Sequence, residues 1–190
     1  MKIMIASDLH GSSFYIEKLI ERYEEEGCEK LLLLGDLLYF SHSSCPPDLF
    51  NRRKAVNLLN SLEDDIICVK GNCDSIMDQE LLYFDMMDDY KTFQYNGKKI
   101  YVTHGHYYGE FDPPQLSDGD ILITGHTHVP ACKDHGFWYL NPGSVSLPKQ
   151  NSWHGYMLFE DGLFTWKDLD GEEKMSFNMA DGTYKELDSL

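Results

Sequence analysis

The stretch ILITGHTH, residues 121–128, joins a short apolar run to a turn that carries two histidines one residue apart. A short run rich in isoleucine and bounded by a turn is typical of a buried β-strand. Gly125 lets the backbone turn closely, and His126 and His128 follow it. Two histidines at this spacing are hard to explain as packing, so the turn is a candidate site for binding or chemistry.

The same order of strand and polar turn recurs earlier in the chain. Short runs rich in Ile, Val or Leu occupy residues 2–7, 30–34, 66–70 and 98–103. The polar residues that follow these runs are Asp8 and His10, Asp36, Asn72, and His104. Because the carboxyl ends of strands converge at one edge of an open α/β sheet, we expect these side chains to meet there.

Helices are predicted between the early strands. Residues 12–26 carry apolar side chains at helical spacing, Gly27 suits the C-terminal cap, and Asn51 is expected to cap a second helix. Later strands are predicted at 138–141, 155–160 and 163–168, with Asp-Gly at 161–162 as a hairpin turn. Residues 41–47 are expected to form a polar loop, and 112–116 a short turn or helical piece. The alternation of strands and helices predicts an α/β sandwich.

The length and hydropathy of the chain fit an ordinary soluble domain. A chain of 190 residues suits one domain, residues 1–190, with 42% hydrophobic and 25% charged residues. The apolar runs are too short to cross a bilayer, and the N-terminus does not resemble a signal peptide. We therefore expect a cytoplasmic protein with no membrane partner.

Charge and cysteine usage narrow the partners and the compartment. Five cysteines, none in a CxxC arrangement, cannot all pair, which favours reduced thiols in a reducing compartment. Sixteen basic against thirty-two acidic residues give a net charge of −16. Binding of long nucleic acid depends on Lys and Arg, so no such partner is expected. A small phosphorylated molecule held by metal ions remains compatible with this charge.

The polar residues at the strand ends predict a metal site when they are taken together. A lone Asp after a strand is usually a turn former, and a lone His usually lies on the surface or in a satisfied core. Seven such residues in five turns are a much stronger signal. Carboxylate, imidazole and amide groups gathered at one edge suit hard or borderline divalent metal ions.

The ordered motifs resemble those of the calcineurin-like metallophosphoesterase superfamily. They are DLH at 8–10, GD at 35–36, GNCD at 71–74, HG at 104–105 and GHTH at 125–128. The NPGS at 141–144 and the chain length are similar to those of the compact bacterial YfcE-type phosphodiesterases within that superfamily. The resemblance implies an α/β fold in which a two-sheet β-sandwich is flanked by helices, in four layers.

The resemblance also implies two divalent metal ions and their ligands. One ion would be held by Asp8, His10 and His128, the other by Asn72, His104 and His126, and Asp36 would bridge both. Such a pair clamps the attacking and leaving oxygens and supplies hydroxide for attack on phosphorus. Because the set contains no thiolate, Mn²⁺ is the leading metal, and Fe, Zn, Co and Ni remain open.

Cys73 stands where many members of the superfamily carry a histidine that protonates the leaving group. That histidine would be held by the following acid, here Asp74, so the resemblance assigns both positions to the catalytic turn. A nucleophilic thiol would need a lowered pKa and a partnered base, and the sequence names neither. A cysteine ligand is unnecessary because the metal sites are already filled. A filling role for Cys73 is therefore favoured, which removes the obvious general acid.

The remaining histidines and two tyrosines carry weaker expectations. His106 is close enough to contact substrate or to orient His104, and a surface role fits it equally well. Tyr107 and Tyr108 could line the cleft or simply pack. The histidines expected on the surface are His42, His135 and His154.

Three functions follow from these observations. The first is a dimetal-dependent phosphodiesterase for small phosphodiesters, since an activated leaving group departs without a strong proton donor. The second is a protein-binding scaffold like the VPS29 subunit of retromer, which keeps this fold and loses catalytic ligands. The third is a phosphomonoesterase, which the cysteine at position 73 disfavours. Compact relatives are described as homo-oligomers, although no interface signature stands out in this sequence.

Overall fold

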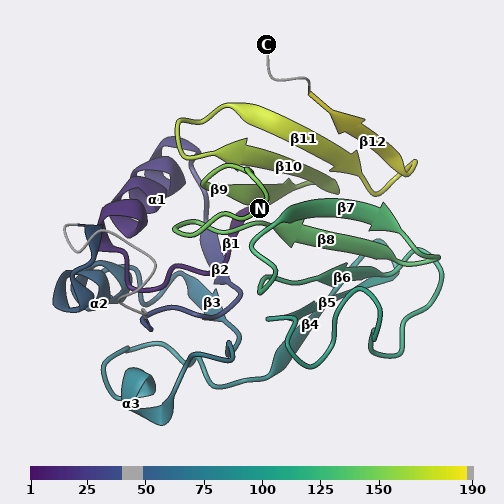
Figure 1. Ribbon diagram of the computed structural model, residues 1–190. Helices are drawn as coiled ribbons and strands as arrows, with labels where there is room; N and C mark the ends of the chain where they lie inside the picture. Colours follow the sequence, from purple (N-terminus) through teal and green to yellow (C-terminus); the bar gives the residue numbers. More distant parts are fainter. Residues whose placement is uncertain (40–48, 188–190) are drawn as a thin grey trace.

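The structure, a computed structural model, describes residues 1–39 and 49–187 (Figure 1). Its helices are α1 (Ser13–Glu25), α2 (Arg52–Asn60) and α3 (Ile76–Gln79). Its strands are β1 (Lys2–Ala6), β2 (Lys30–Leu33), β3 (Ile66–Cys68), β4 (Tyr90–Tyr95), β5 (Lys98–Thr103), β6 (Ile121–Ile123), β7 (Pro130–Asp134), β8 (Trp138–Pro142), β9 (Gly155–Glu160), β10 (Leu163–Asp168), β11 (Glu173–Asn178) and β12 (Thr183–Glu186).

The strands form two mixed sheets, which confirms the predicted sandwich. One sheet has seven strands in the order β12-β11-β10-β9-β1-β2-β3, and the other has five in the order β4-β5-β6-β8-β7. Parallel pairs form the part of each sheet that matters for the site: β1, β2 and β3 in the larger sheet, and β5, β6 and β8 in the smaller one. The carboxyl ends of all six strands can therefore reach one edge of the sandwich.

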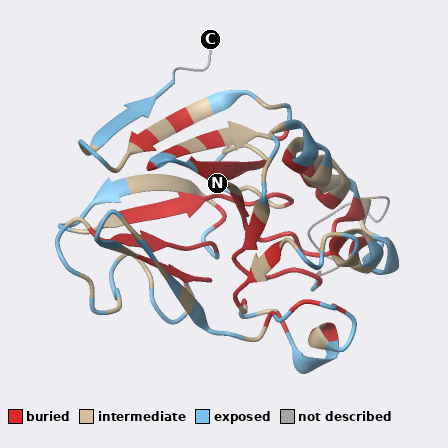
Figure 2. Cartoon of the chain, turned by 180° about the vertical axis from the view of Figure 1, so that it is seen from behind, coloured by how far each residue is buried: buried red, intermediate tan, exposed pale blue. Residues whose placement is uncertain are grey.

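Burial on both faces explains why the early strands are almost continuously apolar. Met4 and Leu31 pack with α1 and α2 on the outer face of the larger sheet, which these helices cover in Figure 1. Ile5 and Leu32 point the other way, into the core between the two sheets. Figure 2 shows the central strands as buried and the outer elements as partly exposed. A strand with two buried faces loses the polar alternation of a surface strand.

Local capping signals place the two longer helices. The Ser12 hydroxyl accepts a hydrogen bond from the backbone N–H of Tyr15, and Asn51 caps α2 in the same way. Gly27 follows α1 with a positive φ of 65°, as a C-terminal cap requires. The hairpin between β9 and β10 also forms as predicted, with positive φ at Asp161 and Gly162.

Several elements were not predicted from the sequence: α3, β4, β7, β11 and β12. Residues 112–116 contain no helix, and the predicted loop at 41–47 lies outside the described residues, as does His42. His135 is exposed as expected, whereas His154 is half-buried and stacks on Tyr15 with ring centroids 4.1 Å apart. The cysteines of the described ranges are free thiols: Cys28, Cys68, Cys73 and Cys132. None of the described helices is long and apolar enough to span a membrane.

Candidate metal centre

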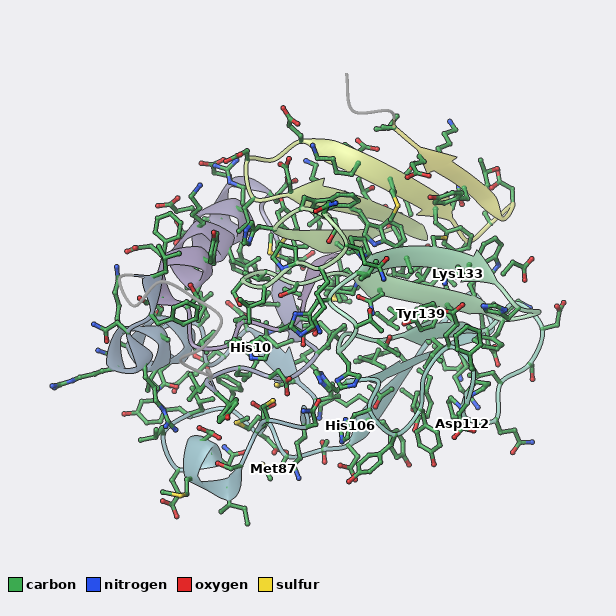
Figure 3. All side chains as sticks on the ribbon, in the orientation of Figure 1. His10, Met87, His106, Asp112, Lys133 and Tyr139 are labelled. Atoms are coloured by element: carbon green, nitrogen blue, oxygen red, sulfur yellow. The ribbon has the colours of Figure 1, made fainter. Side chains whose placement is uncertain are left out.

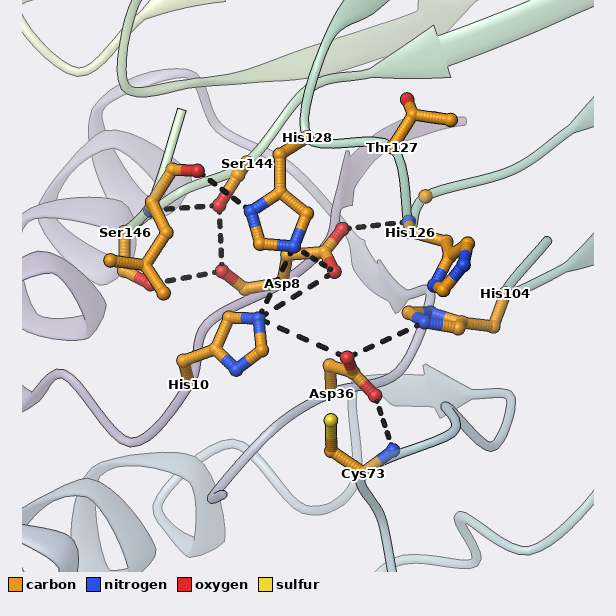
Figure 4. A network of polar contacts seen from close by, with 12 residues as sticks. Asp8, His10, Asp36, Cys73, His104, His126, Thr127, His128, Ser144 and Ser146 are labelled. Atoms are coloured by element: carbon orange, nitrogen blue, oxygen red, sulfur yellow. Dashed lines mark hydrogen bonds and ion pairs between the residues drawn. The ribbon is translucent and has the colours of Figure 1, made fainter. Parts of the chain in front are cut away.

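The seven residues predicted to bind metal all follow the carboxyl ends of strands, and the two sheets bring them to one place; all of them except Asn72 are labelled in Figure 4. The larger sheet contributes the turns after β1, β2 and β3, and the smaller sheet those after β5 and β6. The side chains therefore come from segments up to 120 residues apart in the sequence. Packing of one sheet on the other is what assembles this cluster.

Five of the seven residues have an unusual backbone conformation. Positive φ angles occur at Asp8 (56°), His10 (46°), Asp36 (54°), His126 (65°) and His128 (62°). Such a conformation costs a non-glycine residue about 1–3 kcal/mol and persists only where its surroundings enforce it. Strained residues of this kind concentrate at functional sites, and here they coincide with the polar cluster.

Two motif glycines make room for the carboxylates. A Cβ atom at Gly71 would overlap the side chain of Asp36, and one at Gly125 would overlap the Ser7 hydroxyl and crowd Asp8. These contacts involve buried groups that have little space to move. The glycines in the GNCD and GHTH turns are therefore required by close approach of backbone to the cluster.

Asp8, His10 and His128 form the first group. Their potential ligand atoms all lie within 4.8 Å of one another. The Nε2 atoms of His10 and His128 are 3.4 Å apart, and Nε2 of His128 lies 3.2 Å from Oδ1 of Asp8. All three residues are buried.

Hydrogen bonds at Nδ1 set the tautomer of three cluster histidines. In each ring Nδ1 faces a backbone carbonyl, which can only accept, so Nδ1 carries a proton and Nε2 is the nitrogen turned toward the cluster. The carbonyls belong to Tyr39 for His10 (2.9 Å), Leu34 for His104 (2.7 Å) and Leu147 for His128 (2.7 Å). This arrangement prepares each Nε2 to bind a cation.

The second group surrounds His104. Its Nε2 lies 3.0 Å from Oδ1 of Asn72 and 3.5 Å from Oδ2 of Asp36. Because Nδ1 already donates to a carbonyl, both ring nitrogens face acceptors, which favours a positive charge on the ring. Burial opposes that charge, but contact with Asp36 outweighs it and raises the pKa of His104. A cation at Nε2 would satisfy the same acceptors.

The unsatisfied atoms of the cluster fit a bound metal ion. Oδ1 of Asp8 is buried and makes no hydrogen bond, although His128 is close. The facing Nε2 atoms of His10 and His128 hold two lone pairs against each other. A buried acceptor without a donor is costly, and a divalent cation would satisfy the carboxylate and both imidazoles at once.

The cluster carboxylates are held in their charged form. Burial alone would raise the pKa of Asp8, but the close contact with His128 and the charges of His104 and His128 lower it. Burial opposes the charge of Asp36 as well, and His104 and the backbone N–H of Cys73 lower its pKa. Both carboxylates therefore stay ionised at neutral pH and well into the acidic range.

His126 and His106 lie at the margin of the cluster. The backbone N–H of His126 donates to Oδ2 of Asp8 (3.0 Å), and its exposed ring lies 5.1 Å from that of His104. The ring of His106 is 5.4 Å from that of His104, with its centroid 6.4 Å from that of His126. Burial and the neighbouring histidines lower the pKa of both, so both rings are neutral at pH 7.

Cys73 lies inside the cluster and is held as a thiol. Its ligand atom lies within 4.8 Å of those of His10 and Asp36. Burial and the charge of Asp36 raise the pKa of Cys73 to about 12. A thiol with this pKa is a poor nucleophile at neutral pH, which agrees with the filling role inferred from the sequence.

The carboxylate of Asp74 links two turns of the cluster. Its oxygens accept three backbone N–H groups, from Asp36 (2.8 Å), Leu37 (2.8 Å) and Gly71 (2.8 Å). It therefore ties the turn after β2 to the turn after β3 and positions Asp36.

Sequence reasoning missed three residues at the end of β8 and just after it that support the cluster. The hydroxyls of Ser144 and Ser146 both donate to the backbone carbonyl of Asp8, at 2.9 and 3.0 Å. Nδ2 of Asn141 donates to the carbonyl of Gly125 (2.7 Å), which holds the turn of His126 and His128. The NPGS motif, which contains Asn141 and Ser144, was the available signal, and Ser146 lies two residues beyond it.

Comparison with known proteins identifies the family of the chain. Residues 1–161 match the family described as a calcineurin-like phosphoesterase superfamily domain. The chain is 34% identical over 166 residues to Phosphodiesterase YfcE of Escherichia coli K12, covering 87% of this chain and 90% of YfcE. It is 25% identical over 166 residues to Probable metallophosphoesterase YsnB of Bacillus subtilis, covering 83% of each.

Solved structures extend the comparison to three dimensions. YfcE, described as a phosphoesterase from E. coli, matches with a TM-score of 0.89 at 33% identity, covering 94% of this chain and 100% of that one. Wild-type Vps29 from Entamoeba histolytica, complexed with Zn²⁺, matches with a TM-score of 0.55 at 22% identity, covering 97% of this chain and 96% of that one. The likeness to Vps29 concerns the fold alone.

Proposed function

The chain belongs to the calcineurin-like phosphoesterase superfamily, and from that premise we propose that it hydrolyses small phosphodiesters with the aid of two divalent metal ions. The observation that carries this proposal is the convergence of two ionised carboxylates with the Nε2 lone pairs of three histidines. YfcE, the phosphodiesterase to which the chain is similar over most of its length, supports a diester as substrate.

We assign one ion to Asp8, His10 and His128, and the other to Asn72, His104 and His126, with Asp36 shared. The position of Asp36 supports the shared role, because its Oδ2 lies 3.8 Å from Nε2 of His10 and 3.5 Å from Nε2 of His104. His126 is the least constrained of this set, since its ring is exposed. Cys73 and Asp74 belong to the same turn, as filler and positioning residue.

Two bound divalent ions would activate water and neutralise negative charge at the phosphorus. The protein residues then have three tasks: to hold the ions, to turn Nε2 of the ligand histidines toward them, and to admit the ester. Because only two ligand carboxylates face two divalent ions, the occupied centre is net positive. This attracts an anionic diester although the chain carries a charge of −16.

The finer assignments follow from the ligand chemistry and the composition. Nitrogen and oxygen ligands without a thiolate favour Mn²⁺, with Fe, Zn, Co and Ni as competitors. We place the protein in the cytoplasm as a single domain over residues 1–190, acting on small diesters, with no membrane or long nucleic acid as partner. A homo-oligomeric state stays a prediction.

A scaffold function is the alternative that the fold itself raises. Vps29 shares this fold and has been crystallised with Zn²⁺, so metal binding alone does not separate an enzyme from a scaffold. Turnover separates them. Metal-stripped protein should be reloaded with Mn²⁺, Ni²⁺, Co²⁺, Zn²⁺ or Mg²⁺ and assayed on phosphodiesters and phosphomonoesters. Diester hydrolysis that depends on the added metal supports the proposal, and metal binding without turnover on any ester overturns it.

Replacement of His128 by Ala should weaken chiefly one of the two ions. We expect metal content to fall from two ions toward one at limiting Mn²⁺, with the rate partly restored by excess Mn²⁺. Elemental analysis and kcat/KM across a Mn²⁺ titration measure this. His135→Ala is the matched control, because His135 is exposed, contacts Glu110 and lies in the turn before β8, at the opposite end of that strand from the cluster. Unchanged metal content in His128→Ala would remove His128 from the ligand set.

Metal affinity should fall as the pH drops from 7.5 to 5.5. Protons compete for the histidines, and the raised pKa of His104 lets this competition begin at a higher pH than for a free imidazole. The lowered pKa values of Asp8 and Asp36 keep both carboxylates ionised over the same range. We expect a loss of about tenfold per pH unit for each proton displaced. Calorimetric titration with Mn²⁺ tests this, and an affinity that stays constant down to pH 5.5 would contradict it.

A further inference from the structure

Three exposed tyrosines line a cavity next to the cluster. The cavity has a volume of about 380 Å³ and is lined by Asp89, Tyr90, Thr103, Tyr107 and Tyr108. The tyrosines keep 52%, 64% and 41% of their surface exposed, for Tyr90, Tyr107 and Tyr108 respectively. Sites for small organic ligands have volumes of roughly 300–1,000 Å³, so the cavity can hold part of a substrate.

The cavity is one side chain away from the proposed metal ligands. Thr103 directly precedes His104 at the end of β5, and Tyr107 follows in the same turn. The ring of His106, labelled in Figure 3, lies 4.1 Å from that of Tyr107 and 5.4 Å from that of His104. An ester bound at the cluster can therefore extend past His106 into the cavity.

The walls of the cavity are held in place from behind. The buried ring of Tyr101 stacks on Tyr90, with centroids 4.9 Å apart and planes at 16°, and it meets Tyr108 edge-on at 6.0 Å. Exposed aromatic rings that are fixed in this way lose little entropy when a ligand stacks on them. The parts of the three outer rings that stay exposed are available for binding.

The polar groups of the cavity point to a ring that carries N–H donors. The hydroxyl of Thr103 is already engaged, since it donates to the backbone carbonyl of Asp89 (2.9 Å). The carboxylate of Asp89 makes no hydrogen bond or ion pair with any described residue. A planar, uncharged group with N–H donors would stack on the tyrosines and donate to this carboxylate, which is the chemistry of a nucleobase.

We propose that this tyrosine cavity is the subsite for the nucleoside part of a phosphodiester substrate. The proposal rests on the proposed function and specifies its substrate class. Stacking supplies affinity that does not depend on charge. This suits a chain with a net charge of −16, because its surface outside the metal centre repels anions. The base lies against the tyrosines, and the phosphate lies at the cluster on the other side of His106.

Two diesters with the same leaving group test the subsite. Guanosine 5′-(p-nitrophenyl) phosphate and methyl p-nitrophenyl phosphate both release p-nitrophenolate. A difference in kcat/KM between them therefore comes from the group that stays on the phosphate, guanosine or methyl. With Mn²⁺-loaded protein we expect kcat/KM to favour the guanosine ester by about tenfold to a hundredfold, carried mainly by KM. Tyr90→Leu and Tyr107→Leu should each remove most of that preference and leave turnover of the methyl ester unchanged.

The controls separate stacking from folding and from catalysis. Tyr107→Phe keeps the ring and should keep the preference. Phe111→Leu should also keep it, because Phe111 is 88% exposed on the same segment but does not line the cavity. Binding of guanosine alone, followed by calorimetry, needs neither metal nor turnover, and it should weaken in Asp89→Asn. If neither diester is hydrolysed, the proposed function fails, while guanosine binding still decides the subsite.

Three results would overturn the subsite. The first is an equal kcat/KM for the two diesters. The second is a preference for the guanosine ester that survives Tyr90→Leu and Tyr107→Leu. The third is a preference confined to an ester with an organic cation, such as the choline ester of p-nitrophenyl phosphate. The last result would assign the tyrosines and Asp89 to recognition of a cation instead.

Discussion

Asp36→Asn should reduce kcat/KM by on the order of 10³-fold or more, because Asp36 is the carboxylate that we propose both metal ions share. Its Oδ2 faces the imidazoles of His10 and His104, and its Oδ1 accepts the backbone N–H of Cys73 (2.8 Å). Asparagine can keep the bond to the backbone, but it removes the negative charge between two cations. Their mutual repulsion then loses its compensation, and the second ion should bind much more weakly.

Elemental analysis, kcat/KM and thermal unfolding should be measured together on this variant. Asp120→Asn is the matched control, because Asp120 is also a buried carboxylate that accepts two backbone N–H groups, those of Lys99 and Ser117. It lies outside the cluster and should retain metal content and activity. Full activity with two bound ions in Asp36→Asn would refute the bridging assignment.

Cys73→His should add a proton donor that the natural chain lacks. The Cys73 sulfur lies among His10, Asp36 and the exposed amide of Asn72, which donates to it at 3.2 Å. An imidazolium at this position is favoured by the charge of Asp36. General acid catalysis contributes about 10²–10⁴-fold when well placed, and we expect a gain of roughly tenfold to a hundredfold for esters with poor leaving groups.

The gain should be confined to substrates that need a proton. Turnover of alkyl monoesters should rise relative to that of nitrophenyl diesters, and activity should fall at high pH as the imidazolium loses its proton. Cys73→Asn is the control, since it is polar but cannot act as a general acid. Because the oxygens of Asp74 are taken up by backbone N–H groups, the new ring must be oriented by Asp36 or by water, which limits the gain. Equal changes on all esters would reject the missing-acid explanation.

Structural features that depend on only a few neighbouring residues could be predicted from the sequence. The strand ends that carry the seven polar residues were predicted correctly, as were the caps at Ser12 and Asn51 and the hairpin at 161–162. Each depends on apolar periodicity, a capping side chain or a turn dipeptide. Three missed strands, β4, β11 and β12, had the same kind of signal: Asn96–Gly97 joins β4 to β5, and Asp181–Gly182 joins β11 to β12.

The sequence by itself determined which residues are available to bind metal and that they follow buried strands, because strand patterns and turn residues are local. Only the tertiary structure decided how they are held. The proton on Nδ1 of His128 is fixed by the carbonyl of Leu147, and the backbone of Asp8 by Ser146, which is 138 residues away in the chain. Such partners meet only when the two sheets pack, and packing depends on the whole chain, so no local pattern reports which acceptor a given side chain will find.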